Sequence, residues 1–574
     1  MKRITSHAAL ITTLLASTLL AACSKNNEAQ SIDPSPTNTP SASSSASAEP
    51  ISYEPLGKYP ETVTVTQVLG FNPPEDANAM PGLTPETNGY LKDLKEMLNI
   101  ELKYKWTVPA DQYDQKFNLA IASGDLPDMM VVDYSTFMKF KEQGILEDLT
   151  EAYKNYASPL LKKIIESDGG FGLEAGTQDG KLLGLTKSSF GGAQVLWIRK
   201  DWLDNLHLPV PTSMEELEKV AEAFVNNDPD QNGKKDTYGI ALIKNFLTGW
   251  GFDAKGFFQS NGSYPLAWLK GADGKLIPGE IQPETKAALE RLNSWYKKGI
   301  IEKEFVLKDE SKESEDLISG KVGISFGEWW YPNWPLNLNK DKDPKAEWIQ
   351  LELPSLNGNP GKTLLSRVLS PIMVVKKGFK NPEAAIKIAN LFQELQGTKY
   401  VTKDSPDYKG PSTGYVQEWF LPRYYGGYKD IYLAVNEALD ANKEKLELPE
   451  DFVGLGEAQT WFDAAKKYRA NPKDNTAWGM YYSRVAKDGG VALALRTEED
   501  PSKYVLNEYY GPPTPTQVEK GASLNKLTNE TFTKMIMGAT PISEFDKYVG
   551  SWRKLGGDDI TAEVNEWYEK NAVK

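Results

Sequence analysis

In residues 62–106 the apolar residues recur at strand spacing in some stretches and at helical spacing in another, and this pattern limits the class of fold that the chain can adopt. Residues 62–69 alternate at a period of two, as a strand does. Residues 84–98 carry a helix cap followed by leucines at helical spacing, and residues 100–106 return to a strand pattern. Because a helix between two strands favours parallel pairing, the sequence predicts an α/β fold.

Two polar residues follow the next predicted strand. The helix predicted over residues 111–123 ends before the apolar run 129–132, which is typical of a buried strand. Ligands of open α/β sheets gather at the carboxyl ends of strands, so Asp133 and Tyr134 are candidate substrate-binding residues. A simple strand-to-helix turn explains the same two residues equally well.

The N-terminus has the pattern of a secreted lipoprotein. A basic start precedes an apolar run over residues 8–22, which is too short for a stable membrane span. Leu-Ala-Ala directly before Cys23 matches the bacterial lipobox, in which the cysteine thiol is lipidated. We therefore predict a signal peptide over residues 1–22, a lipid anchor on Cys23, and a protein held at the extracytoplasmic face of the cell membrane. The alternative is an ordinary signal peptide with an incidental cysteine.

Composition excludes several kinds of chemistry. Cys23 is the only cysteine, so a lipidated mature chain has no disulfide, thiolate metal site or cysteine nucleophile. His7 belongs to the predicted signal peptide, which leaves His207 alone and rules out a centre built from several histidines. The net charge of −14 argues against nucleic acid as a partner. Residues 23–59 are rich in Ser, Pro, Ala and Thr and are predicted to form a disordered spacer.

Several short motifs, in this order along the chain, resemble family 1 extracellular solute-binding proteins, the receptors of carbohydrate ABC importers. The first are Ser-Gly-Asp-Leu-Pro-Asp at 123–128 and Leu-Trp-Ile-Arg-Lys-Asp-Trp-Leu at 196–203. Later ones are Gly-Glu-Trp-Trp at 327–330, Pro-Thr-Pro-Thr at 513–516 and Gly-Gly-Asp-Asp-Ile-Thr at 556–561. The likeness is greatest to the large Gram-positive lipoproteins of the family. No single motif is specific, but their order over most of the chain is.

The resemblance implies a two-lobe, clamshell fold of the periplasmic-binding-protein type, with discontinuous lobes joined by a hinge. The segments that cross between the lobes are expected near residues 185–194 and 366–371. The expected division is residues 60–187 and 366–445 in lobe 1, and residues 188–365 and 446–574 in lobe 2. By the same resemblance the chain is a monomeric receptor, not an enzyme, that binds an oligosaccharide and works with ABC importer permease subunits.

A calcium-type loop occupies residues 228–239. Acidic or amide side chains stand at its positions one, three, five and nine, and a backbone carbonyl is available at position seven. The predicted ligands are Asp228, Asp230, Asn232, Lys234 and Asp236. Gly239 replaces the glutamate of an EF-hand at position twelve, so a further oxygen must come from elsewhere. We expect a structural Ca²⁺; a solvated turn is the alternative.

Aromatic residues are the candidates for binding a sugar, because their flat faces stack on sugar rings. Trp329 and Trp330 follow the predicted strand 322–326 and are the first choices, and Trp268 and Tyr510 are weaker ones. A single tryptophan is more often part of a core than of a binding site.

Other motifs fail. The run Gly-Asn-Pro-Gly-Lys-Thr at 358–363 ends like a phosphate loop, but the first required glycine is replaced by Leu356. An extracytoplasmic glycosidase remains the enzyme alternative, because paired carboxylates among 79 acidic residues leave no sequence signature. An adhesive or sensory surface lipoprotein is the third class.

Overall fold

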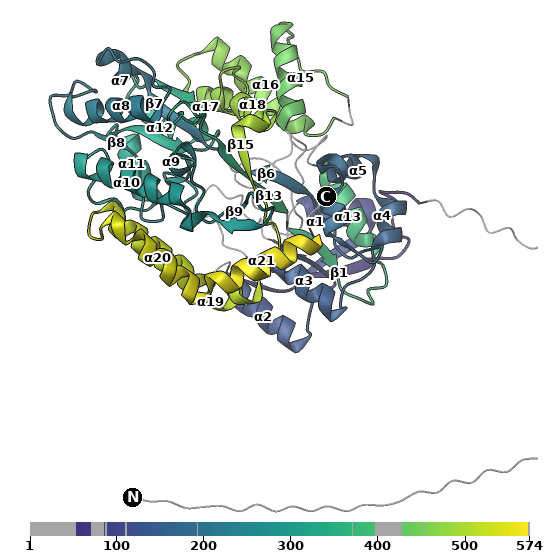
Figure 1. The fold of residues 1–574 in the computed structure, drawn as a ribbon. Helices are drawn as coiled ribbons and strands as arrows, with labels where there is room; N and C mark the ends of the chain where they lie inside the picture. Colours follow the sequence, from purple (N-terminus) through teal and green to yellow (C-terminus); the bar gives the residue numbers. More distant parts are fainter. Residues whose placement is uncertain are drawn as a thin grey trace, which may run out of the picture. The chain divides into compact units, whose positions relative to one another are not determined.

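The computed structural model describes residues 53–70, 85–86, 89–109, 112–191, 193–369, 371–395, 428–449 and 452–571 (Figure 1). The predicted signal peptide, Cys23 and the spacer as far as residue 52 lie outside the described residues. None of the helices in the described ranges is long and apolar enough to cross a membrane.

The first lobe begins with the predicted strand–helix–strand unit. β1 (Val63–Gly70) runs parallel to β2 (Ile100–Val108). Between them lie the short helix α1 (Gly89–Asp93) and a π-helical turn, η1 (Leu94–Leu98). The leucines at both ends of η1 are buried, because their helical spacing directs them to one side. The prediction of an α/β fold with a parallel strand pair is confirmed.

The chain returns to this lobe after residue 371. β3 (Met129–Val132) pairs antiparallel with β14 (Ile372–Val375). α13 (Glu383–Glu394) then packs against α4 (Thr150–Tyr156) and α5 (Pro159–Ile165). The remaining elements here are α2 (Tyr113–Ser123), α3 (Tyr134–Gln143), α6 (Phe171–Ala175), β4 (Thr177–Gln178) and β5 (Lys181–Leu182).

A four-stranded sheet forms the centre of the second lobe, in the order β12–β7–β11–β8. Its strands are β7 (Val195–Arg199), β8 (Tyr238–Ile240), β11 (Val322–Gly327) and β12 (Trp348–Leu351). The helices near it are α7 (Lys200–Asn205), α8 (Met214–Asn226), α9 (Lys255–Ser260), α10 (Pro283–Lys298), α11 (Glu310–Ile318) and α12 (Leu336–Lys342). Every residue of β7 and β11 is buried, because side chains cover both faces of the sheet.

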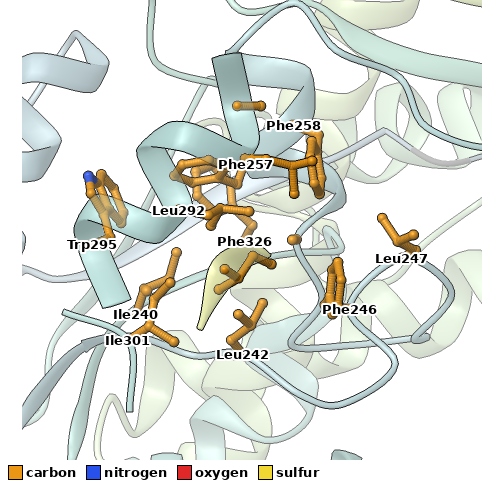
Figure 2. Packing of buried hydrophobic residues seen from close by; sticks show 14 of the residues in the cluster. Ile240, Leu242, Phe246, Leu247, Phe257, Phe258, Leu292, Trp295, Ile301 and Phe326 are labelled. Carbon is orange, nitrogen blue, oxygen red and sulfur yellow. The ribbon is translucent and has the colours of Figure 1, made fainter. Parts of the chain in front are cut away.

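Aromatic packing joins the helices of the second lobe to its sheet (Figure 2). The ring of Phe257 on α9 lies edge-on to Trp295 of α10, with centroids 5.0 Å apart. It also lies edge-on to Phe326 of β11, at 6.2 Å. Edge-to-face pairs of this kind add to the free energy of burial, so the three elements form one core.

Three strands from distant parts of the sequence form a separate sheet, in the order β15–β13–β6. β6 (Ser188–Gly191) is antiparallel to β13 (Thr363–Leu369), which is parallel to β15 (Tyr504–Asn507). The pairing of β6 with β13 thus joins the two segments expected to cross between the lobes, 185–194 and 366–371, by backbone hydrogen bonds. The sequence did not indicate the third strand.

The helices of the C-terminal third form two groups. α15 (Tyr428–Asp440) packs with α16 (Leu455–Ala470), α17 (Asn475–Arg484) and α18 (Gly490–Glu498). α19 (Pro515–Ile536), α20 (Phe545–Trp552) and α21 (Asp558–Asn571) lie near α10 and the hairpin of β9 (Trp268–Lys270) and β10 (Leu276–Pro278).

α15 packs with the helices that follow it. Its Ile431 and Val435 are buried in the same cluster as Trp461 and Phe462 of α16. α17 in turn contacts α12, and the expected lobe boundary at residue 445 stays a prediction.

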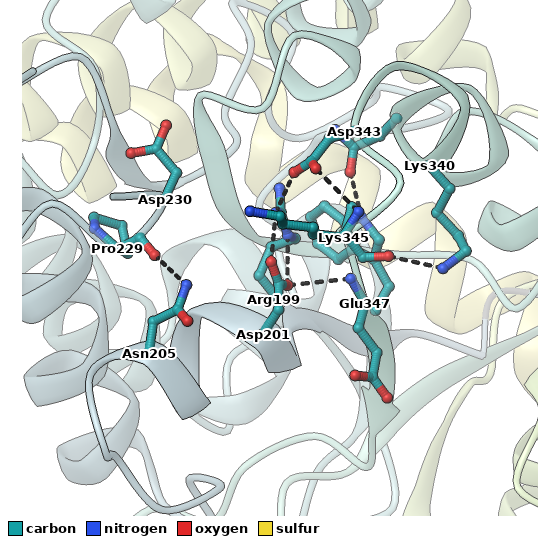
Figure 3. A network of polar contacts seen from close by, with 12 residues as sticks. Arg199, Asp201, Asn205, Pro229, Asp230, Lys340, Asp343, Lys345 and Glu347 are labelled. Atoms are coloured by element: carbon teal, nitrogen blue, oxygen red, sulfur yellow. Dashed lines mark hydrogen bonds and ion pairs between the residues drawn. The ribbon is translucent and has the colours of Figure 1, made fainter. Parts of the chain in front are cut away.

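A buried arginine joins three elements of the second lobe (Figure 3). Arg199, at the end of β7, has a side chain that is 1% exposed. Its Nε donates to Asp201 Oδ1 at 2.8 Å, and its Nη2 donates to Asp201 Oδ2 at 2.6 Å and Asp343 Oδ2 at 3.0 Å. The guanidinium also lies 4.8 Å from the ring centroid of Trp202 and 5.8 Å from that of Trp348. The buried charge is therefore paired and stacked.

Replacing this arginine should destabilise the fold. Arg199→Met removes the cation but leaves Asp201 with reduced solvation, and we expect the free energy of unfolding to fall by about 3 kcal/mol. Urea unfolding followed by circular dichroism measures the change. Lys570→Met is the matched control, because Lys570 and its partner Glu566 are both well exposed. Equal midpoints for the two variants would contradict a stabilising role for Arg199.

Candidate functional site

A cavity of about 610 Å³ lies where the crossing strands meet both lobes. Its first-lobe lining includes Ser167 and Asp168, and the crossing segments contribute Lys187, β6 and Arg367. The second lobe supplies Glu328 and Trp329 from the loop after β11, together with residues of α15 and α18. A larger hollow of about 800 Å³ lies beside the start of β1, but it contains none of the residues predicted to bind substrate. The 610 Å³ cavity is therefore the candidate site.

Trp329, a first choice among the expected sugar-binding residues, follows the buried strand β11 and borders this cavity. Its half-buried ring lies edge-on to Tyr428, with centroids 5.2 Å apart, and the Arg484 guanidinium lies 5.2 Å from its centroid. The backbone is fixed as well: a Cβ on Gly490, at the start of α18, would lie 2.0 Å from the Trp329 carbonyl oxygen. Only a glycine permits that approach, so the helix holds the tryptophan in place.

Trp330, the other first choice, points into a different environment. Its ring stacks on Trp250 at 6.1 Å and on Trp334 at 6.4 Å, and it does not border the cavity. Trp250 is 54% exposed, so this stack of three tryptophans faces solvent. The structure thus separates two adjacent residues that the sequence placed together.

The four weaker candidates have local packing partners and do not border the cavity. Asp133 caps α3, its Oδ1 accepting from Thr136 N at 2.7 Å, which is the simple turn considered above. Tyr134 stacks on Phe137. Trp268 is 8% exposed and packs in the second-lobe core beside Tyr509.

Tyr510 lies edge-on to both Phe171 and Trp567, with centroids 5.0 Å and 4.9 Å away. Its hydroxyl donates to the Asn571 carbonyl oxygen at 3.0 Å. Because Phe171 belongs to the first lobe and Trp567 to the C-terminal helix, Tyr510 joins two parts of the chain.

Charged groups in the cavity were missed by the sequence reasoning. The Glu328 carboxyl accepts a hydrogen bond from Gln194 Nε2 at 2.8 Å. Burial raises the pKa of this carboxyl to about 7, although the positive charge of Lys255 opposes the shift. Lys187 is 8% exposed, and burial lowers the pKa of its ammonium. Adjacency to Trp329 could have indicated Glu328, and position in an expected crossing segment could have indicated Lys187.

The loop expected to bind calcium is a tight turn in which carboxylates approach one another. Asp228 accepts from the backbone N–H groups of Asn232 and Gly233, and Asn232 Nδ2 donates to Asp230 Oδ2 at 2.6 Å and Asp236 Oδ1 at 3.2 Å. Burial, followed by the neighbouring Asp228 and Asp236, raises the pKa of Asp230. These hard oxygen donors suit Ca²⁺.

The ligand set of this loop is nevertheless incomplete. Among the described residues, no group of three or more His, Cys, Asp or Glu side chains is arranged to hold a metal ion. Gly239 offers no side-chain oxygen at position twelve. The loop therefore has the chemistry for calcium, while its carboxylates would have to move closer together to bind it.

Comparisons with known proteins agree with this architecture. A family model for bacterial extracellular solute-binding proteins matches residues 82–399. Lipoprotein LipO of Bacillus subtilis (strain 168) is 24% identical over 502 residues, which cover 86% of this chain and 91% of LipO. The polygalacturonan/rhamnogalacturonan-binding protein YtcQ of the same strain is 25% identical over 495 residues, covering 85% and 89%.

A solved structure shows the same fold. It is the S. pneumoniae ABC-transporter substrate-binding protein FusA, an EF-hand mutant in complex with fructo-nystose. The two chains superimpose with a TM-score of 0.55 at 19% identity, over 89% of this chain and 99% of FusA. Since the family model spans more than half of the 574 residues and the relatives align along most of their length, the chain belongs to the bacterial extracellular solute-binding protein family.

Proposed function

We propose that this chain is a receptor that captures an oligosaccharide and delivers it to the permease subunits of an ABC importer. The observation that carries the proposal is the cavity in which the ring of Trp329 meets polar side chains at the crossing strands. An aromatic face can stack on a sugar ring while polar groups bind its hydroxyls. The names of YtcQ and FusA, which describe sugar-binding proteins, support the same reading.

The mechanism we infer is closure of the two lobes around the ligand. The cavity takes side chains from both lobes and from β6 and β13, so a bound sugar contacts both sides at once. A ligand that binds the closed state more tightly shifts the population toward it. The importer can then distinguish loaded receptor from empty receptor. We propose that the receptor acts as a monomer without catalysis.

Trp329 provides the first test. Trp329→Ala should weaken oligosaccharide binding at least tenfold, equivalent to about 1.4 kcal/mol, because it removes the aromatic face in the cavity. Isothermal titration calorimetry against a panel of plant and microbial oligosaccharides measures the affinity. Trp250→Ala is the matched control, since Trp250 belongs to the solvent-facing stack, and we expect a change below about threefold.

Two results would contradict the proposal. A larger loss for Trp250→Ala would move the binding site to the solvent-facing stack. Hydrolysis of the sugar during the titration would instead favour the glycosidase alternative.

We also propose that the loop 228–239 binds one structural Ca²⁺. The approach of Asp228, Asp230 and Asp236 supports this, because burial, together with the neighbouring Asp228 and Asp236, raises the pKa of Asp230, and a bound cation would favour its charged form. The FusA structure is that of an EF-hand mutant, which indicates that a relative carries a loop of this kind. Asp228, Asp230, Asn232 and Asp236 would contribute side-chain oxygens, and Lys234 a carbonyl.

Calcium should raise the melting temperature. A ligand that binds only the folded state stabilises it by about 2.7 kcal/mol at one hundred times its dissociation constant. Differential scanning calorimetry with chelator and with millimolar Ca²⁺ measures the shift. Asp236→Ala should abolish the response yet keep the turn, because the described contact of the Asp236 side chain within the loop is with Asn232. Identical curves for the wild-type protein in both buffers would refute calcium binding.

Finally, we propose that the protein is anchored to the membrane through Cys23, on the strength of the Leu-Ala-Ala-Cys motif. Cys23→Ser should abolish metabolic labelling with palmitate and release the protein from the membrane fraction. Ser24→Ala, next to the motif, is the control and should leave labelling intact. Labelling of Cys23→Ser at the wild-type level would exclude this anchor.

A further inference from the structure

Lys187 is a buried cation at the edge of the cavity. It directly precedes β6, is 8% exposed and lines the cavity. Its Nζ donates to the Ser188 carbonyl oxygen at 3.4 Å, a long hydrogen bond. Among the described residues, no carboxylate forms an ion pair with it. A buried ammonium in this position favours an anion as its partner.

Asp168, which borders the same cavity, does not fill that role. Its Oδ1 accepts from Gly170 N at 2.9 Å, and its Oδ2 accepts from Gly172 N at 2.9 Å and Ser188 N at 2.6 Å. Burial opposes ionisation, but these backbone donors hold the pKa of Asp168 below its usual value. The hydrogen bonds of the Asp168 carboxylate are therefore made to backbone N–H groups, including those of the turn before α6. Its interaction with Lys187 is a longer-range electrostatic one.

A second cation lies at the same end of the cavity. The Arg367 guanidinium, on β13, is 4.0 Å from the ring centroid of Phe171 and also borders the cavity. The next residue, Gly172, is pressed against the Lys187 backbone: a Cβ there would lie 2.6 Å from the Lys187 Cα. Residues 171–172 thus contact the Arg367 guanidinium and the Lys187 backbone.

The lining that comes from the second lobe is acidic. Glu328 is buried and bound to Gln194, and Glu498 and Glu499 line the wall formed by α18. Among the described residues of this wall the cation is Lys429, which is already paired with Glu499 at 2.5 Å. Apart from Asp168, which is bound by backbone N–H groups, and Lys429, which is paired with Glu499, the cations of the cavity lie on the first-lobe side and the carboxyls on the second-lobe side.

We propose that the ligand of this cavity is an acidic oligosaccharide, whose uronate carboxylate binds Lys187 and Arg367 while neutral hydroxyls face Glu328. This inference rests on the proposed function and adds the charge of the sugar and its direction in the cavity. Carboxylates form short, charge-assisted hydrogen bonds with ammonium and guanidinium groups, and these are about twice as strong as neutral ones. A neutral sugar would leave the cation at Lys187 without such a partner.

Calorimetry with matched acidic and neutral sugars tests the proposal. The probes are trigalacturonic acid and trimannuronic acid, each compared with its neutral methyl ester of the same length. We expect at least one acid to bind at least tenfold more tightly than its ester. Lys187→Met should reduce that preference at least tenfold and leave ester binding within about threefold. A purely structural role for Lys187 would weaken both members of a pair equally.

Two further variants complete the experiment. Lys187→Arg keeps the charge and should keep the preference, which guards against misfolding of Lys187→Met; melting curves check all variants. Lys487→Met is the control, because Lys487 is exposed, is paired with Asp440 and does not line the cavity, and it should change affinity for the acid less than about threefold.

The results separate the two proposals. Tight binding of neutral oligosaccharides from the panel, unchanged by Lys187→Met, would overturn the acidic ligand but leave the receptor function intact. No binding of acidic or neutral sugars would overturn both.

Discussion

The antiparallel pairing of β6 with β13 is the constraint on which the candidate site depends. It joins Ser366 to Gly191 and Leu369 to Ser188 across two segments that are far apart in the sequence. Lys187 precedes one strand and Arg367 lies in the other, so the register fixes both cations relative to the cavity. A slip of one residue would turn Arg367 to the opposite face of the sheet.

A second set of contacts fixes the opposite wall. The Trp197 indole N–H donates to the Glu328 carbonyl oxygen at 3.0 Å, and Gln194 Nε2 donates to its carboxyl group. Both donors lie on or beside β7, in the sheet that also holds β11. The loop that carries Trp329 is therefore held by the rigid centre of the second lobe.

Local patterns predicted what depends on local structure. The period of residues 62–106 predicted β1, the helical segment and β2, because alternation and helical spacing follow directly from backbone geometry. Trp329 and Trp330 could not be separated, since neighbouring residues in a loop have no period that assigns each a direction. α15 packs its buried face against α16, and a contact between two separate helices is not assigned by any local pattern.

Residues whose role arises from distant contacts gave little signal. Lys187 is buried because α6 packs on the segment before β6, and only its place in an expected crossing segment pointed to it. Asp133 shows the opposite case. An aspartate at the end of a strand suits both helix capping and ligand binding, so the local pattern could not distinguish these two roles. The lobe assignments and the lipid anchor at Cys23 remain predictions.

The close approach of Gly490 to the Trp329 carbonyl oxygen has a consequence for how receptors of this kind diversify. Any larger residue at position 490 would displace the loop, so the backbone under the aromatic platform tolerates little variation. New ligand preferences must then arise by exchanging side chains around a fixed platform. Protein engineers who wish to redirect this receptor to another sugar should keep that glycine and vary the charged residues that face the tryptophan across the cavity.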